Sequence, residues 1–181
     1  MGMAASIPYY TVDDLEHLPR DGNRYEVLGG VLLVTPAPGP AHQVIVARVV
    51  TLLSTALATP GHALVFVDGA VSFPPRTQLE PDILVVPSRA SIPEKWTELR
   101  DYWLAVEVYS RSSRIYDHDF KRENYHRLGV SEVWLVDRVE RTVEISRATG
   151  ESEVVSDVVV WTPPTLDFEV RIDLNPIFAG Q

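Results

Sequence analysis

The strongest constraint on the fold comes from two near-continuous apolar runs in the middle of the chain, DILVVP at 82–87 and WLAVEVY at 103–109. Runs of this kind are typical of central strands that are covered on both faces. Further β-rich runs follow at 132–137, 142–147 and 153–161. We therefore expect a mixed central sheet with the two apolar runs among its inner strands.

Two glycine-containing turns predict β-hairpins. Gly29-Gly30 separates two β-rich runs within 24–35, and Asp68-Gly69 separates ALVFV at 63–67 from AVSF at 70–73. Residues that tolerate positive φ favour tight two-residue turns between antiparallel strands. Both pairs of runs are therefore expected to pair as hairpins.

Helical patterns flank these strands. Apolar residues recur at helical spacing over 41–57, and a second helix is expected over 117–128. A short helix is predicted to begin at Thr11, and a short strand with a helical turn at 174–178 closes the chain. The expected fold is α/β (α+β), a mixed sheet flanked by helices with additional hairpins.

Composition sets limits on the class of protein. No internal repeat or linker divides the 181 residues, so we expect one domain spanning 1–181, with a flexible N-terminus at 1–10. The absence of cysteine excludes disulfides and thiolate metal sites. The opening residues lack a signal-peptide pattern, and no apolar stretch approaches the roughly 18 residues of a membrane span. We expect a cytoplasmic protein with no membrane partner.

The net charge of −9 counts against a general affinity for nucleic acids, which requires basic residues that displace counterions from phosphates. Any phosphodiester substrate would have to be held by a local group of side chains and a metal.

Glu107 is the most informative single residue, because it interrupts the apolar run LAVEVYS. A buried carboxylate is costly unless it is paired or bound to a metal. Strand alternation places Glu107 on the same face as Ala105 and Tyr109. The alternative is the solvated face of an edge strand.

Asp82 and Lys121 complete the candidate constellation. Asp82 begins one apolar run and Glu107 ends the next, so pairing of the two strands would bring the two carboxylates together. Such a pair suits Mg²⁺, which prefers oxygen ligands. The alternative for Asp82 is a residue that only forms the turn before the strand.

Lys121 is notable because only it and Lys95 are lysines among the sixteen basic residues. On the expected helix Lys121 shares a face with Tyr125. We expect Tyr125 to pack in the core. The alternative for Lys121 is a solvated surface lysine.

Pro81-Asp82, Glu107 in a β-run and a following lysine resemble the PD-(D/E)XK nuclease superfamily. The chain resembles more closely the bacterial putative restriction endonuclease family, a domain-of-unknown-function branch of that superfamily. The matching stretches, in order, are RYEVLGG, PAPGPAHQ, EPDILVV, VEVYSRSS and DHDFKRENYHRLGVSEVWLVD.

The resemblance implies a restriction-endonuclease-like core and a set of site residues. It implies Mg²⁺, with Mn²⁺ able to substitute, bound by Asp82, Glu107 and the backbone carbonyl of Val108. Lys121 would replace the lysine of the superfamily motif, whose position holds Tyr109, and Glu26 would be a third carboxylate. His42 and Gln43 are candidate substrate-binding residues.

Two further departures from the family pattern are Arg111, where proline is usual, and Gly29, where aspartate is expected.

The functional expectation is a Mg²⁺-dependent endonuclease that hydrolyses phosphodiester bonds in DNA and acts as a homodimer. Removal of Lys121 or Glu107 is expected to abolish cleavage and leave the fold intact. An alternative is a catalytically inactive nuclease-fold module that assembles through exposed apolar strand edges such as VVVW at 158–161. A third possibility is an enzyme that acts on RNA or a nucleotide.

Overall fold

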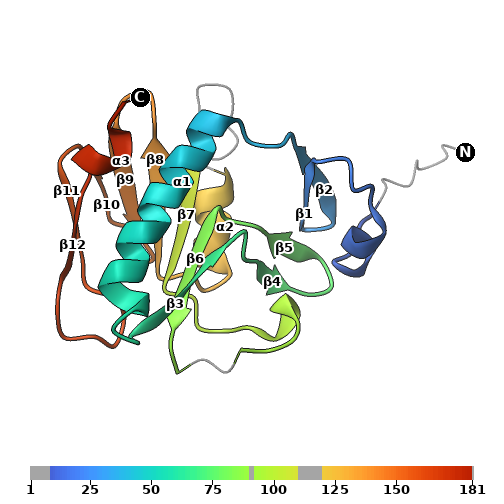
Figure 1. Cartoon of the computed structure of the whole chain (residues 1–181). Helices are drawn as coiled ribbons and strands as arrows, with labels where there is room; N and C mark the ends of the chain where they lie inside the picture. Colours follow the sequence, from blue (N-terminus) through green and yellow to red (C-terminus); the bar gives the residue numbers. More distant parts are fainter. Residues whose placement is uncertain (1–8, 90–91, 110–119, 181) are drawn as a thin grey trace, which may run out of the picture.

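The computed structural model describes residues 9–89, 92–109 and 120–180. The expectations for residues 1–8, for Arg111 and for the start of a helix at Asp117 lie outside these residues. These residues form an α+β fold of three sheets and few helices, as expected (Figure 1).

The central element is a six-stranded sheet with the strand order β10-β9-β8-β7-β6-β3. Strands β7 and β8 are parallel and all other neighbours are antiparallel, so the sheet is mixed. Every residue of β6, β7 and β8 is buried, which confirms the two apolar runs as inner strands. The strands are β3 (Ala63–Val67), β6 (Ile83–Pro87), β7 (Leu104–Tyr109), β8 (Glu132–Asp137), β9 (Thr142–Arg147) and β10 (Ser152–Val155).

A smaller antiparallel sheet has the strand order β2-β1-β5-β4. Its first hairpin turns at Gly29 and Gly30, with φ angles of 60° and 88°, and confirms the prediction for this segment. Glycine adopts this left-handed backbone without the steric cost of a Cβ. The strands are β1 (Arg24–Leu28), β2 (Val31–Thr35), β4 (Val71–Phe73) and β5 (Thr77–Leu79).

The predicted hairpin between 63–67 and 70–73 is wrong. Strand β3 pairs with β6, and β4 pairs with β5 in the other sheet. The turn at Asp68-Gly69 therefore carries the chain from one sheet to the other, and the Asp68 N–H donates to the carbonyl of Asp82 (3.2 Å). A Cβ at Gly69 would lie 3.1 Å from the Cβ of Leu84, so the close approach of the two sheets favours glycine.

The run at 153–161 is two strands and not one. It breaks after β10, and β11 (Val158–Trp161) pairs with β12 (Val170–Asp173) in a separate two-stranded sheet. Val159 and Trp161 are buried, and the Trp161 ring lies 5.5 Å from that of Trp134. One edge of VVVW thus pairs with β12, and alternate side chains of β11 pack into the core. Assembly through this strand stays a prediction.

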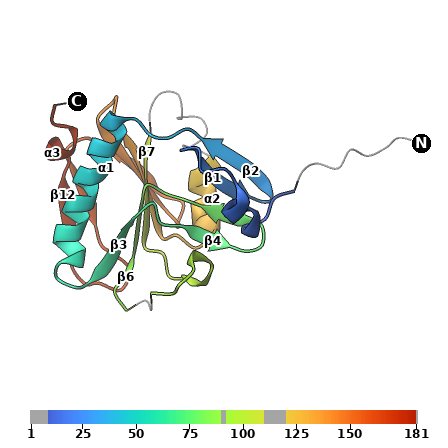
Figure 2. The same ribbon diagram turned by 45° about the vertical axis from the view of Figure 1, so that its right-hand side comes forward.

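Helices cover the two faces of the central sheet. Helix α1 (Pro40–Leu53) continues as a π-helical turn at Ser54–Ala58 and lies across one face, with α3 (Asn175–Phe178) beside it (Figures 1 and 2). Helix α2 (Arg122–Arg127) packs against β8. Short 3₁₀ turns occupy Asp13–His17, near the short helix predicted to begin at Thr11, and Trp96–Glu98.

The two faces of the central sheet bury separate cores. The first lies under α1, α3 and the two-stranded sheet, and includes Ile45, Leu53, Val106, Trp134 and Trp161. The second lies between the central sheet, the four-stranded sheet and α2. Its members include Leu33, Val71, Leu84, Ala105 and Tyr125.

Contrary to the expectation from sequence, one helical stretch is long and apolar enough to cross a membrane by length and composition alone. It runs over Pro40–Ala58 with a mean hydropathy of 1.5. One side of this stretch packs into the first core through Ile45, Val49 and Leu53.

Candidate active site

Asp82, immediately before β6, lies opposite Glu107 on the neighbouring strand β7. The antiparallel register pairs Ile83 with Val106, and its continuation by one residue sets Asp82 against Glu107. Both side chains are buried, with 3% and 4% of their surface exposed. The Val108 N–H donates to Asp82 Oδ2 (2.8 Å) and fixes the orientation of that carboxylate. The structure thus brings the two predicted carboxylates together.

Glu107 points to the second core, on the same side as Ala105 and Tyr109. Its Oε1 accepts a hydrogen bond from the Tyr125 hydroxyl (2.6 Å) and lies 3.2 Å from Lys121 Nζ. Burial and the negative charge of Glu107 raise the pKa of Tyr125 well above its ordinary value. The hydroxyl therefore remains a proton donor at neutral pH, and Tyr125 has a polar role in addition to the expected packing.

Lys121 reaches the site from the residue immediately before α2. Its side chain is buried, and Nζ lies 2.8 Å from Glu26 Oε2 as well as 3.2 Å from Glu107 Oε1. The contact with Glu26 is an ion pair whose angles fall outside those of a hydrogen bond. Tyr109, at the position of the superfamily lysine, is buried in the second core. The lysine that contacts the strand glutamate therefore comes from the helix.

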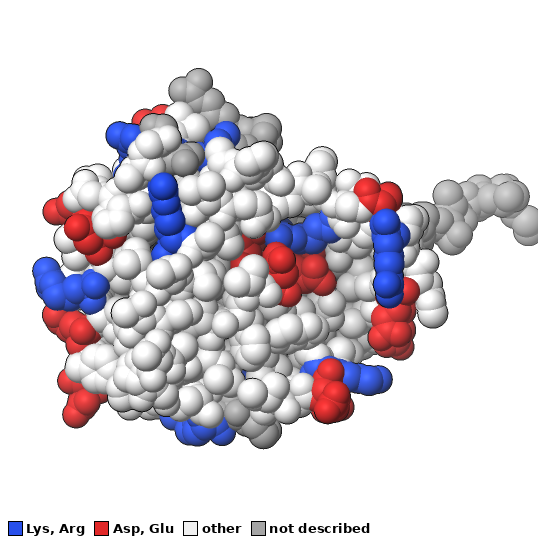
Figure 3. Space-filling view, viewed as in Figure 1, with Lys and Arg blue, Asp and Glu red and all other residues white. Residues whose placement is uncertain are grey.

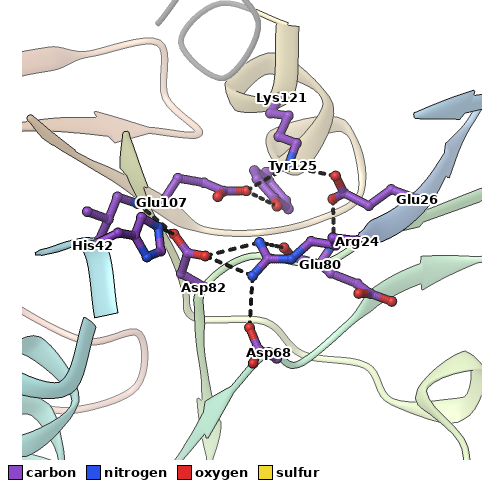
Figure 4. Close-up of polar contacts among 10 residues, drawn as sticks. Arg24, Glu26, His42, Asp68, Glu80, Asp82, Glu107, Lys121 and Tyr125 are labelled. Atoms are coloured by element: carbon purple, nitrogen blue, oxygen red, sulfur yellow. Dashed lines mark hydrogen bonds and ion pairs between the residues drawn. The ribbon is translucent and has the colours of Figure 1, made fainter. Parts of the chain in front are cut away.

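Glu26 brings the four-stranded sheet into the site. It lies on β1 with no exposed surface, and its Oε1 accepts the Glu80 N–H (2.7 Å). Burial and the neighbouring charge of Glu26 raise the pKa of Glu80. Glu26, Lys121 and Glu107 form a continuous chain of charges between the two sheets (Figure 4).

Arg24 is a site residue that the sequence reasoning missed. Both terminal nitrogens lie 3.0 Å from Asp82 Oδ1, and the guanidinium also donates to the Glu80 carbonyl (3.1 Å) and to Asp68 (2.9 Å). Burial lowers the pKa of Arg24, but the charges of Asp82 and Glu107 outweigh burial and raise it overall. The available signal was strand alternation, since Arg24 and Glu26 are two residues apart and share a face of β1.

His42 contacts the site and Gln43 does not. His42, in the first turn of α1, places Nε2 2.9 Å from Asp82 Oδ2. Burial raises the pKa of Asp82, but the hydrogen bond with His42 and the charge of Arg24 lower it below the ordinary value. Gln43 is exposed on the same helix and is not among the residues that line the adjoining cavity.

These groups line a cavity of about 910 Å³. Its charged side is formed by Arg24, His42, Asp82, Glu107 and Lys121, and its other side by the largely apolar segment 32–41. Figure 3 shows charged side chains of both signs together in a hollow near the centre of this face, surrounded by uncharged surface.

The donor set fits a hydrated Mg²⁺. No three Asp, Glu or His side chains in the described part of the chain converge closely enough to hold a metal by themselves. Mg²⁺ needs only one or two protein carboxylates, because it keeps several of its waters. Asp82 and Glu107 supply hard oxygen ligands on the wall of one cavity, which meets that requirement.

A mixed sheet that brings two strand carboxylates and a lysine to one cavity is the arrangement of a restriction-endonuclease-like nuclease. The model of the family described as putative restriction endonuclease (Uma2) matches residues 12–175, and the chain belongs to that family.

A similar solved structure is the crystal structure of a putative nuclease belonging to DUF820 from Anabaena variabilis ATCC 29413. It shares 21% sequence identity with this chain at a TM-score of 0.75, and the match covers 93% of this chain and 97% of that one. This likeness supports the fold. No curated protein matches the sequence.

Proposed function

We propose that this protein hydrolyses phosphodiester bonds in DNA with a divalent cation, Mg²⁺ or Mn²⁺, held by Asp82, Glu107 and the Val108 carbonyl. The observation that carries the proposal is the placement of Asp82 opposite Glu107 on the wall of a cavity, with Lys121 beside them. When bound, the cation would polarise a phosphoryl oxygen and lower the pKa of a coordinated water.

Lys121 is the proposed cationic partner of the reaction. Its ammonium is a compact point charge held by Glu26 and Glu107 at the cavity wall. From that position it would orient the attacking water or stabilise negative charge on the phosphate. Glu26 would keep the ammonium in place and help to position that water.

His42 and Gln43 are the proposed substrate contacts. His42 lines the cavity and holds one oxygen of Asp82, so it would orient the carboxylate as well as approach the substrate. Gln43 is exposed at the adjacent position of α1. A contact from Gln43 would therefore involve substrate that extends beyond the cavity.

The experiment that tests the proposal is nicking of supercoiled plasmid DNA in Mg²⁺ or Mn²⁺. We expect the wild type to cleave and Glu107→Gln to be inactive. Glu132→Gln is a matched control, because Glu132 is also a buried strand glutamate and does not line the cavity. Equal cleavage by wild type and Glu107→Gln contradicts the mechanism. Parallel assays on single-stranded DNA, duplex DNA and RNA identify the substrate.

A catalytically inactive module is the second candidate, and one observation favours it. The site carboxylates already have cationic partners within the chain, Arg24 for Asp82 and Lys121 for Glu26 and Glu107. Calorimetric titration with Mn²⁺ separates the two candidates. The inactive module should show no saturable site that depends on Asp82 and Glu107.

A further inference from the structure

We propose that Arg24 is an exchangeable counterion, which gives up its contact with Asp82 and keeps its contact with Asp68 when a divalent cation binds. This inference rests on the proposed function. It assigns to Arg24 the control of metal affinity, in place of a fixed structural role.

The two oxygens of Asp82 have different partners. Oδ2 is held by the Val108 N–H at 2.8 Å and by His42 at 2.9 Å. Oδ1 instead receives both terminal nitrogens of Arg24, each at 3.0 Å. Two donors on one oxygen lack the paired geometry in which each guanidinium nitrogen binds its own carboxylate oxygen. Arg24 thus contacts the Asp82 oxygen that would bind a cation, and this contact could be replaced by the cation.

Arg24 has other partners that can hold it after it leaves Asp82. One nitrogen lies 2.9 Å from Asp68 Oδ1 and the other donates to the Glu80 carbonyl at 3.1 Å. Asp68 is largely exposed, with 60% of its side chain accessible, and lies at the turn between the two sheets. A small movement of the guanidinium away from Asp82 would release Oδ1, and the existing contact with Asp68 would keep the guanidinium paired (Figure 4).

The charge balance of the site is compatible with the exchange. Glu26, Asp82 and Glu107 carry three buried negative charges, and Arg24 and Lys121 carry two positive charges. Asp68, which Arg24 already contacts, adds a fourth negative charge at the exposed turn. A divalent cation and Lys121 would therefore balance the three buried carboxylates, and Arg24 would remain balanced by Asp68.

The test is calorimetric titration with Mn²⁺ of the wild type, Arg24→Gln, Asp68→Asn and the double variant. Removal of a competing unit charge a few ångströms from the metal should tighten Mn²⁺ binding by about tenfold in Arg24→Gln. Asp68→Asn should weaken binding several-fold in the wild type and have little effect in Arg24→Gln, since the exchange no longer takes place there. Arg48→Gln is the control, because Arg48 is a partly buried arginine that bonds backbone carbonyls away from the cavity.

Equal or weaker binding of Mn²⁺ by a folded Arg24→Gln variant overturns the inference and leaves the proposed function standing. Equal effects of Asp68→Asn in the two backgrounds also overturn it, since they indicate only a long-range loss of negative charge. If Arg24→Gln fails to fold, unchanged binding by the surface variant Asp68→Asn overturns it. Absence of a Mn²⁺ site in the wild type instead removes the proposed function itself, and this inference with it.

Discussion

Lys121 and Glu26 form an ion pair of 2.8 Å between two side chains that are almost completely removed from water. Glu26 belongs to the four-stranded sheet, and Lys121 precedes the helix that packs against the central sheet. Because Lys121 also contacts Glu107, its loss leaves two buried carboxylates without their shared cation. This burial changes the expectation that Lys121 can be removed with the fold intact.

Lys121→Met is therefore expected to reduce the free energy of unfolding by about 3–5 kcal/mol, the usual effect of breaking a buried ion pair. The addition of Glu26→Gln should restore part of this loss. Urea denaturation measures both effects. Lys95→Met, at the exposed second lysine, should lie within about 0.5 kcal/mol of wild type. Equal effects at the two lysines would contradict the ion-pair assignment.

Tyr125→Phe is expected to destabilise the protein by about 1.5–3 kcal/mol, because it removes a hydrogen bond to a charged carboxylate and keeps the ring. Tyr102→Phe provides the comparison, since its buried hydroxyl donates to the neutral carbonyl of Leu99 (2.7 Å) and should cost only about 0.5–1.5 kcal/mol. Chemical denaturation of the two variants gives the difference. A smaller loss for Tyr125→Phe than for Tyr102→Phe would argue against a charged Glu107.

Glu132 gives a pH-dependent prediction away from the site. Burial raises its pKa despite the hydrogen bond from the Trp134 indole (2.6 Å) and the nearby Arg147. The folded state therefore binds this proton more tightly than the unfolded state, so ionisation of Glu132 costs stability as the pH rises from the unfolded pKa through the raised folded pKa.

Glu132→Gln lacks this cost and retains an acceptor for Trp134. Its stability relative to wild type should therefore increase with pH over that interval and then level off. Denaturation curves at several pH values, followed by tryptophan fluorescence, measure the difference. A difference in unfolding free energy between Glu132→Gln and wild type that stays constant across that pH interval would contradict the raised pKa of Glu132.

The first hairpin offers a test of backbone conformation. At Gly29 the φ angle is 60° and an added Cβ would have no neighbour within 4 Å. Gly29→Asp, which introduces the residue expected from the family, should lie within about 0.5 kcal/mol of wild type, because aspartate tolerates this conformation in turns. At Gly30 the φ angle is 88° and a Cβ would lie 2.6 Å from the Tyr9 ring.

Gly30→Ala should therefore be destabilising by at least about 1 kcal/mol. Thermal or urea unfolding ranks the two hairpin variants, and the reverse order would refute the conformational argument.

The central strands and the approach of Asp82 to Glu107 could be predicted because their signals are local. Apolar runs define inner strands, and a carboxylate in such a run stands out against its neighbours. The hairpin predicted at Asp68-Gly69 was wrong for a physical reason. Its composition specifies a change of chain direction but does not specify which sheet receives the next strand.

Arg24 could not be identified in the same way. An arginine at the start of a short strand is ordinarily solvated, and only the packing of the four-stranded sheet over the central one buries its guanidinium. Gln43 is exposed beside His42 on the helix and lies outside the cavity lining, so its role in substrate binding stays a prediction. Contacts between sheets thus set the limit of the sequence-based prediction.

The distribution of charged groups over two sheets also bears on how the chain matures. A molecule in which only the central sheet has formed holds Asp82 and Glu107 but lacks the partners supplied by β1, Arg24 and Glu26. Such an intermediate would have an unbalanced cluster of carboxylates and a lysine without its full set of contacts. The complete set of contacts at the site therefore forms only when both sheets have assembled.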